Sequence, residues 1–238
     1  MDEIRLNKYL AMCGICSRRD ADKLIDEGRV VVNGATAVSG QKVTDADKVS
    51  VDGKAVVRTN KKIVIAYNKP RGVVVTERDA HAKVTIMDMI DYSERLTYAG
   101  RLDKDSEGLI LLTNDGDFIN ASMKGSNHHE KEYIVELDSQ VPEEKLDVLR
   151  DGVYLNELDV TTRPCKIRKI DGCRYNVVIS QGLNRQIRRM FAEVGFTVKK
   201  LKRIRVISVK LGELKVGEYR ELSEEELTEL YRLVGLKY

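Results

Sequence analysis

One continuous stretch of the chain leads from a charged loop into a short apolar segment: Gly100-Arg101-Leu102-Asp103-Lys104-Asp105-Ser106-Glu107-Gly108, then Leu109-Ile110-Leu111-Leu112-Thr113-Asn114-Asp115-Gly116. The apolar run is too short and too uniform for an amphipathic helix, and it is bounded by Gly108 and by Asn114-Asp115-Gly116. It therefore predicts a strand that is covered on both faces. The charged residues are expected on the loop that precedes it.

Arg101 and Asp103 in this loop are candidates for a functional pair. Two residues apart in an extended chain, they point to the same face, and a neighbouring cation keeps a partly buried carboxylate ionised by lowering its pKa. Asp103 is therefore a candidate nucleophile or base. A structural ion pair between Arg101 and Asp103 at a strand edge explains the local pattern equally well.

The composition is that of a globular protein without a membrane segment. The chain has 238 residues, of which 42% are hydrophobic, enough for one large domain or for a medium and a small one. No stretch approaches the roughly 18 apolar residues that a membrane span needs, and the first residues lack the layout of a signal peptide. We therefore expect a cytoplasmic protein with no membrane partner.

Motifs for metals and nucleotide cofactors are missing. The four cysteines do not suggest a disulfide framework, and the C-x-x-C pair Cys13 and Cys16 has no second ligand pair at zinc spacing. There is no G-x-G-x-x-G and no Walker-type loop. The three histidines lie in polar stretches, which disfavours a Ser-His or Cys-His nucleophile. The sequence thus predicts neither a metal site nor a nucleotide cofactor.

Positive charge is concentrated in one segment. Between Gln181 and Lys210 there are nine Lys and Arg residues and one acidic residue, Glu193, although the net charge of the whole chain is only +3. Such a one-sided run favours a phosphate-rich partner, and nucleic acid is the leading interpretation, with an ordinary solvated face as the alternative.

Residues 1–60 are predicted to form a small module of two helices packed on a small sheet. The first helix ends at Gly14, and Ser17 with Asp20 caps the second. Arg29 to Gly34 is predicted as a strand entering an Asn-Gly hairpin turn, and a second strand is predicted over 49–51. The cationic side chains of the second helix share its outer face, where they either contact phosphates or are simply solvated: Arg18, Arg19 and Lys23.

Residues 61–238 are predicted to form an α+β domain on a mainly antiparallel sheet, after a polar linker over 56–62. Strand, turn and strand are expected over 63–75, with further strands over 131–137 and 175–179. A helix capped by Asn184 and ended by Gly195 is expected to bury Ile187, Met190, Phe191 and Val194 and to point three arginines away from the core: Arg185, Arg188 and Arg189. A last helix begins at Ser223 and Glu226.

Motifs in the first quarter of the chain resemble the S4 RNA-binding module. They are Arg5-Leu6-Asn7-Lys8-Tyr9-Leu10, Gly14-Ile15-Cys16-Ser17-Arg18-Arg19 and Val32-Asn33-Gly34, with Ala21, Ile25 and Gly28 between them.

The rest of the chain resembles the pseudouridine synthases, and within them the branch that modifies single uridines of bacterial ribosomal RNA with an S4 module. The motifs occur in the family's order: Asn68-Lys69-Pro70-Arg71-Gly72, Gly100-Arg101-Leu102-Asp103, Leu112-Thr113-Asn114-Asp115-Gly116, Lys131-Glu132-Tyr133, Gly182-Leu183-Asn184-Arg185-Gln186-Ile187-Arg188-Arg189-Met190 and Lys200-Leu201-Lys202-Arg203. His128 to Tyr133 and Gly217 to Leu222 look most like the F type among the synthases that modify 23S ribosomal RNA.

The resemblance implies roles for individual residues. Asp103 acts on the uridine ribose so that the bond from C1′ to N1 breaks and the uracil rejoins through C5; whether it attacks C1′ or removes a ribose proton stays open. Tyr133 stacks on the base, Arg188 pairs with the catalytic carboxylate, and Arg101 helps to replace the flipped base. Ile187 and Leu201 line the base pocket, and the RNA backbone contacts are Arg18, Arg19, Lys23, Arg185, Arg189, Lys200 and Arg203.

The implied reaction is an isomerisation that requires no cofactor and no metal. We expect one uridine of 23S ribosomal RNA as the target, with a transfer RNA as an open second substrate and a monomer as the active species. Two other functions remain open. One is a non-catalytic RNA-binding or ribosome-assembly factor, which would tolerate loss of Asp103. The other is a nucleoside or glycoside hydrolase, for which Asp105 is the only close second acid.

Overall fold

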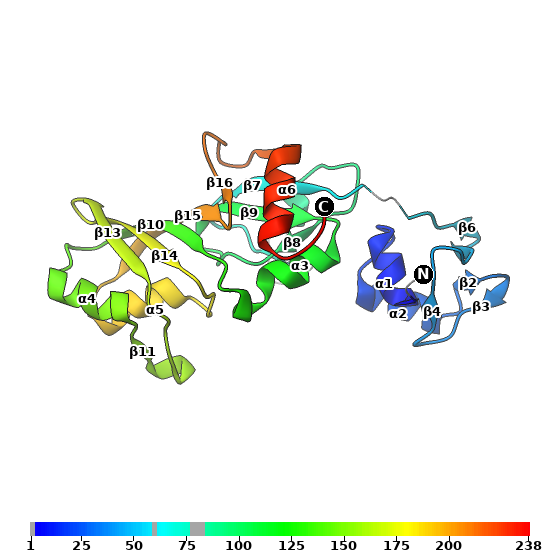
Figure 1. Ribbon diagram of the computed structural model, residues 1–238, viewed down its shortest axis with the longest axis horizontal. Helices are drawn as coiled ribbons and strands as arrows, with labels where there is room; N and C mark the ends of the chain where they lie inside the picture. The colour runs from blue at the N-terminus through cyan, green and yellow to red at the C-terminus, as the bar shows by residue number, and fades with distance from the viewer. Residues whose placement is uncertain (1–2, 59–60, 77–83) are drawn as a thin grey trace. The chain divides into compact units, whose positions relative to one another are not determined.

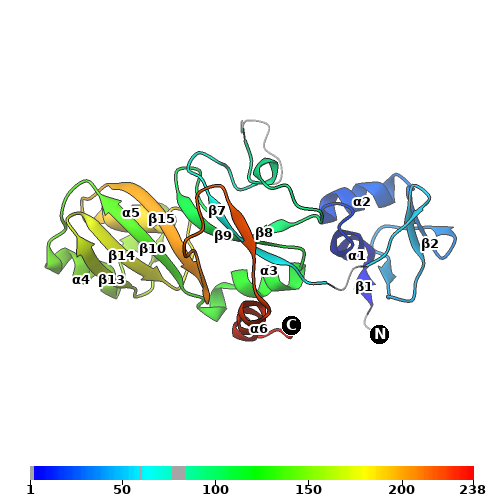
Figure 2. The same ribbon diagram turned by 90° about the horizontal axis from the view of Figure 1, so that it is seen from above.

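The computed structural model describes residues 3–58, 61–76 and 84–238 (Figures 1 and 2). The chain forms two compact units. The smaller comprises residues 1–63 with 92–96 and 114–116, and the larger comprises 64–91, 97–113 and 117–238.

The smaller unit contains two helices and two small antiparallel sheets, of two strands (β1 and β4) and of four strands in the order β3-β2-β5-β6. The elements are β1 (Ile4–Arg5), α1 (Leu6–Met12), α2 (Arg18–Asp26), β2 (Val30–Val32), β3 (Ala35–Thr36), β4 (Lys42–Val43), β5 (Val49–Val51) and β6 (Lys54–Ala55). This arrangement confirms the predicted module.

Local sequence signals in the smaller unit act as expected. The Ser17 hydroxyl accepts a hydrogen bond from the Asp20 N–H and so caps α2. Asn33 and Gly34 both have positive φ, as a tight hairpin turn between β2 and β3 requires. The apolar residues of both helices and the sheet are buried together in one core.

The larger unit is built on a nine-stranded sheet in the order β13-β14-β10-β15-β9-β7-β17, with β16 paired to β15 and β8 to β9. Every pairing is antiparallel except that of β9 with β15, which confirms the α+β prediction. The strands are β7 (Val64–Lys69), β8 (Thr97–Ala99), β9 (Glu107–Thr113), β10 (Lys131–Leu137), β13 (Lys166–Asp171), β14 (Arg174–Ile179), β15 (Val198–Val206), β16 (Val209–Lys210) and β17 (Tyr219–Glu221).

The remaining elements of the larger unit are helical or lie outside the main sheet. The α-helices are α3 (Gly116–Met123), α4 (Glu143–Asp151), α5 (Gln186–Glu193) and α6 (Glu224–Leu233). Three short 3-10 helices and a two-stranded ribbon complete the chain: η1 (Met87–Met89), η2 (Gly125–Asn127), η3 (Asn156–Leu158), β11 (Tyr154–Leu155) and β12 (Val160–Thr161). No helix of the described residues is both long enough and apolar enough to cross a membrane.

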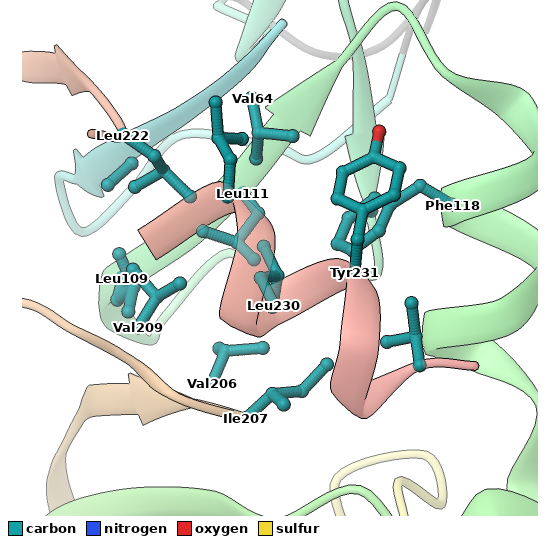
Figure 3. Packing of buried hydrophobic residues seen from close by; sticks show 14 of the residues in the cluster. Val64, Leu109, Leu111, Phe118, Val206, Ile207, Val209, Leu222, Leu230 and Tyr231 are labelled. Carbon is teal, nitrogen blue, oxygen red and sulfur yellow. The ribbon is translucent and has the colours of Figure 1, made fainter. Parts of the chain in front are cut away.

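Strand β9 carries the predicted central run. Leu109, Ile110 and Leu112 are 0% exposed, and Leu111 is 1% exposed, so both faces are covered as expected. Helices α3 and α6 pack on one face, where the Phe118 and Tyr231 rings stack 5.3 Å apart (Figure 3). The predicted capping box of Ser223 and Glu226 opens α6.

The second strand predicted within 63–75 does not form. Beyond Lys69 the chain bends, and only an isolated bridge joins Val74 to Thr85. The reason is that the bend uses the backbone groups that a ladder would need: the Gly72 N–H donates to the Lys104 carbonyl, and the Val73 carbonyl accepts from Lys69 Nζ.

Helices α4 and α5 lie beside the β13, β14, β10 and β15 end of the sheet (Figure 1). Phe191 of α5 packs on Tyr175 of β14, with ring centroids 6.3 Å apart. Strand β10 alternates as predicted, because Tyr133, Val135 and Leu137 are buried. The intervening residues face a polar surface, where Glu132 pairs with Arg205.

Candidate active site

A cavity of about 630 Å³ lies within the larger unit. Its floor is the face of β10 and β15 that carries Tyr133, Leu201 and Arg203. The loop with Arg101 and Asp103 and the segment 179–187 form its walls. The sheet and two connecting segments thus bring together residues that are up to about a hundred positions apart in the sequence.

The apolar part of the floor follows from strand alternation. Tyr133 pairs with Arg203 across the ladder, and Leu201 pairs with Val135, so the side chains of this face share one surface. Tyr133 is 7% exposed and Leu201 6%. Ile187, in the first turn of α5, lines the same cavity and is likewise buried. The two residues expected to line a base pocket therefore lie beside Tyr133.

The Asp103 loop is held by backbone hydrogen bonds. The Ser106 N–H donates to the Asp103 carbonyl at 3.0 Å, which forms a tight turn. Arg203 Nε donates to the Leu109 carbonyl at 2.6 Å and ties the following strand to β15. At the same junction Gly108 has a φ of +105°, and a Cβ there would lie 2.2 Å from the Arg203 carbonyl oxygen. Only glycine permits this close approach of β9 to β15.

Two arginines of the α5 region neutralise the acidic loop. Arg185 Nη1 donates to Asp105 Oδ1 at 3.0 Å and lies 3.9 Å from Asp103 Oδ2. Arg188 Nη2 donates to the Asp105 carbonyl at 3.1 Å and lies 3.4 Å from Asp105 Oδ2. Burial raises the pKa of Asp105, but the hydrogen bonds from Arg185 and the charge of Arg188 outweigh burial and lower it.

This pairing corrects two expectations. Within the described part of the chain no ion pair joins Arg101 to Asp103. The cation nearest to the Asp103 carboxylate is instead the guanidinium of Arg185. Arg188 was expected to pair with the catalytic candidate, but it pairs with Asp105. The cause is that Arg188 Nη1 is held by the Val198 carbonyl, which aims the guanidinium at the backbone of residue 105.

The start of α5 also differs from expectation. Asn184 does not cap the helix. Instead Arg185 occupies the cap position in the left-handed conformation, with a φ of +51°, and makes no capping hydrogen bond through its side chain. Such a conformation costs on the order of 1 kcal/mol for a residue with a side chain, and such residues cluster at functional sites. Asn184 instead accepts hydrogen bonds from Arg189.

The basic residues expected on RNA differ in exposure. Arg188 was expected to point away from the core, but its side chain is only 11% exposed because it lies against the Asp105 loop. Arg203 is 2% exposed and binds backbone carbonyls, so it is not a surface contact. Arg189 pairs with Glu157, and Lys200 is exposed and pairs with Glu136.

The three cationic residues of the smaller unit that were expected to contact RNA lie on α2. Arg18, Arg19 and Lys23 are all exposed on this helix. Lys23 lies 3.8 Å from Asp20, an exposed pairing with little effect on stability. The positions are consistent with an RNA-binding face of the smaller unit.

Two lysines near the site, one buried and one partly buried, were missed by the sequence reasoning. Lys69 is 0% exposed and donates to the Pro70 and Val73 carbonyls, both at 2.9 Å. Lys131 lines the cavity. Burial lowers the pKa of each to about 8. Strand alternation could have predicted the place of Lys131, since this residue lies two positions before Tyr133 and hence on the same face of the strand.

Potential metal ligands are not clustered in the described part of the chain. Among the described residues, no group of three or more His, Cys, Asp or Glu side chains is placed to hold a metal ion. Cys13, Cys16, Cys165 and Cys173 are free thiols.

Two family models match the chain. Residues 4–49 match the S4 domain, and residues 63–193 match the RNA pseudouridylate synthase family, including the cavity loop, Tyr133 and α5. The chain belongs to the RNA pseudouridine synthase family. It therefore isomerises uridine to pseudouridine, and the enzymatic function, rather than the hydrolase or the non-catalytic factor, is supported.

Relatives that align with nearly the whole chain support this assignment. The chain is 42% identical to the dual-specificity RNA pseudouridine synthase RluF of Escherichia coli K12, over 97% of this chain and 79% of that protein. It is 37% identical to the ribosomal large subunit pseudouridine synthase B of Bacillus subtilis, over 96% of each. A crystal structure of a pseudouridylate synthase matches with a TM-score of 0.71 and 32% identity, over 95% of this chain and 99% of that one.

Proposed function

We propose that this synthase isomerises one uridine of 23S ribosomal RNA, with Asp103 as the catalytic carboxylate. One observation carries the choice of residue: of the described residues that line the cavity, Asp103 is the only one with a carboxylate. Its side chain is 29% exposed and is not hydrogen-bonded to Arg185, whereas Asp105 binds two arginines. Asp103 is thus accessible and lies next to a cation.

Each cavity residue has a separate role in the proposed reaction. Asp103 acts on the ribose, and the bond from C1′ to N1 breaks. Tyr133 supports one face of the detached uracil, while Ile187 and Leu201 form an apolar wall that keeps the base in place as it turns. The base then bonds to C1′ through C5, C5 loses a proton and N1 gains one, so that product and substrate are isomers.

The arginines position the loop and the RNA. We assign Arg185 to the electrostatic support of Asp103, because it is the nearest cation to that carboxylate. Arg188 holds the backbone at Asp105 and so keeps the loop in place. Arg101 is exposed beside the cavity, where it can fill the gap left in a stem by the flipped base.

Specificity for ribosomal RNA is proposed from the relatives and from charge. The names of the relatives given above refer to the large ribosomal subunit and to dual specificity, and this supports our choice of 23S RNA as the first substrate and a transfer RNA as the second. Exposed cations supply most of the backbone contacts: Arg18, Arg19 and Lys23 on α2 and Lys200 in the larger unit, with the partly buried Arg189 of the larger unit as a further contact. We propose that the active species is a monomer, because one chain supplies the whole cavity. We also propose that it acts in the cytoplasm.

Mapping of pseudouridine tests this function. Wild type, Asp103→Asn and the control Asp171→Asn, which alters an exposed carboxylate of β13, are incubated with in vitro transcribed 23S RNA and with a transfer RNA pool. The wild type and the control should create one new pseudouridine in 23S RNA, and Asp103→Asn none. Product formation by Asp103→Asn at the wild-type rate would refute the role of Asp103, and modification of transfer RNA alone would refute the 23S target.

A further inference from the structure

Two cations on the cavity floor have unused hydrogen-bonding capacity. Lys131 Nζ donates to a single acceptor, the His129 carbonyl, at 3.4 Å, although a protonated lysine has three N–H donors. Arg203 is 2% exposed, and its Nη2 is buried without any hydrogen-bond partner. Both side chains line the cavity that contains Asp103.

The fold places these cations next to the proposed position of the base. Lys131 lies two residues before Tyr133 on the same face of β10, a rise of about 7 Å along the strand. Arg203 is the residue of β15 that pairs with Tyr133. A ring stacked on Tyr133 would therefore have a cation on each of two sides.

Lys131 has no acidic partner to neutralise it. Among the described residues no carboxylate lies within ion-pair distance of its Nζ. Burial, and after it the charge of Arg203, lower the pKa of Lys131 to about 8, so that it is still mostly protonated at neutral pH. A buried cation without an acidic partner destabilises the folded protein unless a ligand supplies the negative charge.

We propose that Lys131 and Arg203 form a cationic site that binds a carbonyl oxygen of the target uracil and stabilises the negative charge of the detached base. The proposal rests on the synthase activity and on the proposed action of Asp103 at the ribose. When the bond from C1′ to N1 breaks, its electron pair moves onto N1 and spreads over the ring carbonyl oxygens. Donors aimed at the atoms where charge develops are a strong source of rate enhancement in a water-poor cavity.

Kinetics of Lys131→Met test the site. Methionine keeps the length of the side chain and removes its charge. Under single-turnover conditions at saturating enzyme, the rate should fall by about 100-fold or more, while the Kd for RNA should stay within twofold. Lys131→Arg should keep the rate within about tenfold of the wild type, because the charge is retained.

Lys169→Met is the matched control. Lys169 is an exposed residue of β13 that donates to Gln140, outside the cavity, and its replacement should leave rate and affinity unchanged. A rate of Lys131→Met within threefold of the wild type would overturn the proposal. So would an unchanged saturating rate with a weaker Kd, since that pattern indicates a contact to a phosphate rather than to the base.

The leaving group provides an independent signature. Fluorine at C5 stabilises the uracil anion, so RNA with 5-fluorouridine at the target depends less on the cations. The rate of cleavage of the C1′ to N1 bond should fall less in Lys131→Met with this RNA than with unmodified RNA. An equal loss with both RNAs indicates a purely structural effect and overturns the site.

Failure of the proposed substrate is distinguishable from failure of the site. If the wild type modifies neither 23S nor transfer RNA, the substrate proposal fails. The site is then tested without RNA by titration with 6-azauracil, an acidic analogue that carries the negative charge of the detached base. Wild type should bind it at least tenfold more tightly than Lys131→Met, and equal binding overturns the site.

Discussion

The substitution Lys131→Met should make the protein more stable at neutral pH, although it removes a hydrogen bond. Lys131 lies in a cavity, its Nζ has one long hydrogen bond, and burial lowers its pKa from 10.5 to about 8. The folded state thus holds the Lys131 proton less tightly than the unfolded chain does. A site built to bind a negative charge is expected to reduce stability in this way until its ligand arrives.

The magnitude follows from the difference between the two pKa values. Each tenfold change in proton affinity corresponds to about 1.4 kcal/mol, so charged Lys131 reduces the free energy of unfolding by up to about 3 kcal/mol. Lys131 reduces stability by this full amount below pH 8, where its side chain is protonated in both the folded and the unfolded state. The reduction disappears as the pH rises to 10.5. Because the side chain can turn toward water, we expect Lys131→Met to be about 1 to 3 kcal/mol more stable at pH 7.

Urea unfolding of wild type and Lys131→Met at pH 7 and pH 10 measures this difference. The difference in the free energy of unfolding between the two proteins reports the contribution of Lys131 alone, because the other titrating groups contribute equally to both. The gain should be largest at pH 7 and smaller at pH 10, with equal m-values. The reasoning is refuted if the variant is less stable at pH 7, or if its gain does not change with pH. Lys169→Met should change stability by less than about 0.5 kcal/mol at either pH.

Three further predictions concern the fold and RNA binding. Gly108→Ala should lower the free energy of unfolding by about 3 kcal/mol or more in urea titrations, because a Cβ meets the backbone of β15 at 2.2 Å; a loss below 1 kcal/mol would contradict that contact. Lys69→Met should destabilise by about 1 to 3 kcal/mol, the opposite sign to Lys131→Met, although burial lowers the pKa of both lysines, because the loss of a donor by two carbonyls outweighs the removal of the charge; a gain in thermal stability would disprove this. Arg18→Glu with Arg19→Glu should weaken RNA binding at least tenfold in filter assays and reduce its salt dependence, with the saturating rate unchanged; unaltered affinity argues against α2 as an RNA face.

Local signals in the sequence were sufficient for most of the secondary structure. The capping side chains of α2 and α6, the alternation of β10 and the apolar run of β9 act between residues a few positions apart, so the sequence contains all that they need. The expected strand after Gly72 failed for a reason that is not local. Lys104, over thirty positions away, takes the place of a neighbouring strand as the hydrogen-bond partner.

Patterns in the sequence alone predicted the order of the two domains, the S4 and synthase motifs and the loop that carries Asp103. The packing of the folded chain sets which charges meet: Arg185 and Arg188 both contact Asp105, about 80 positions earlier in the chain, and Arg203 is buried against β9 instead of lying on the outer surface. The cause is distance. An ion pair or a cavity wall depends on separations of a few ångströms between segments that are remote in the chain, and these separations are set by the packing of strands and helices rather than by the spacing of residues.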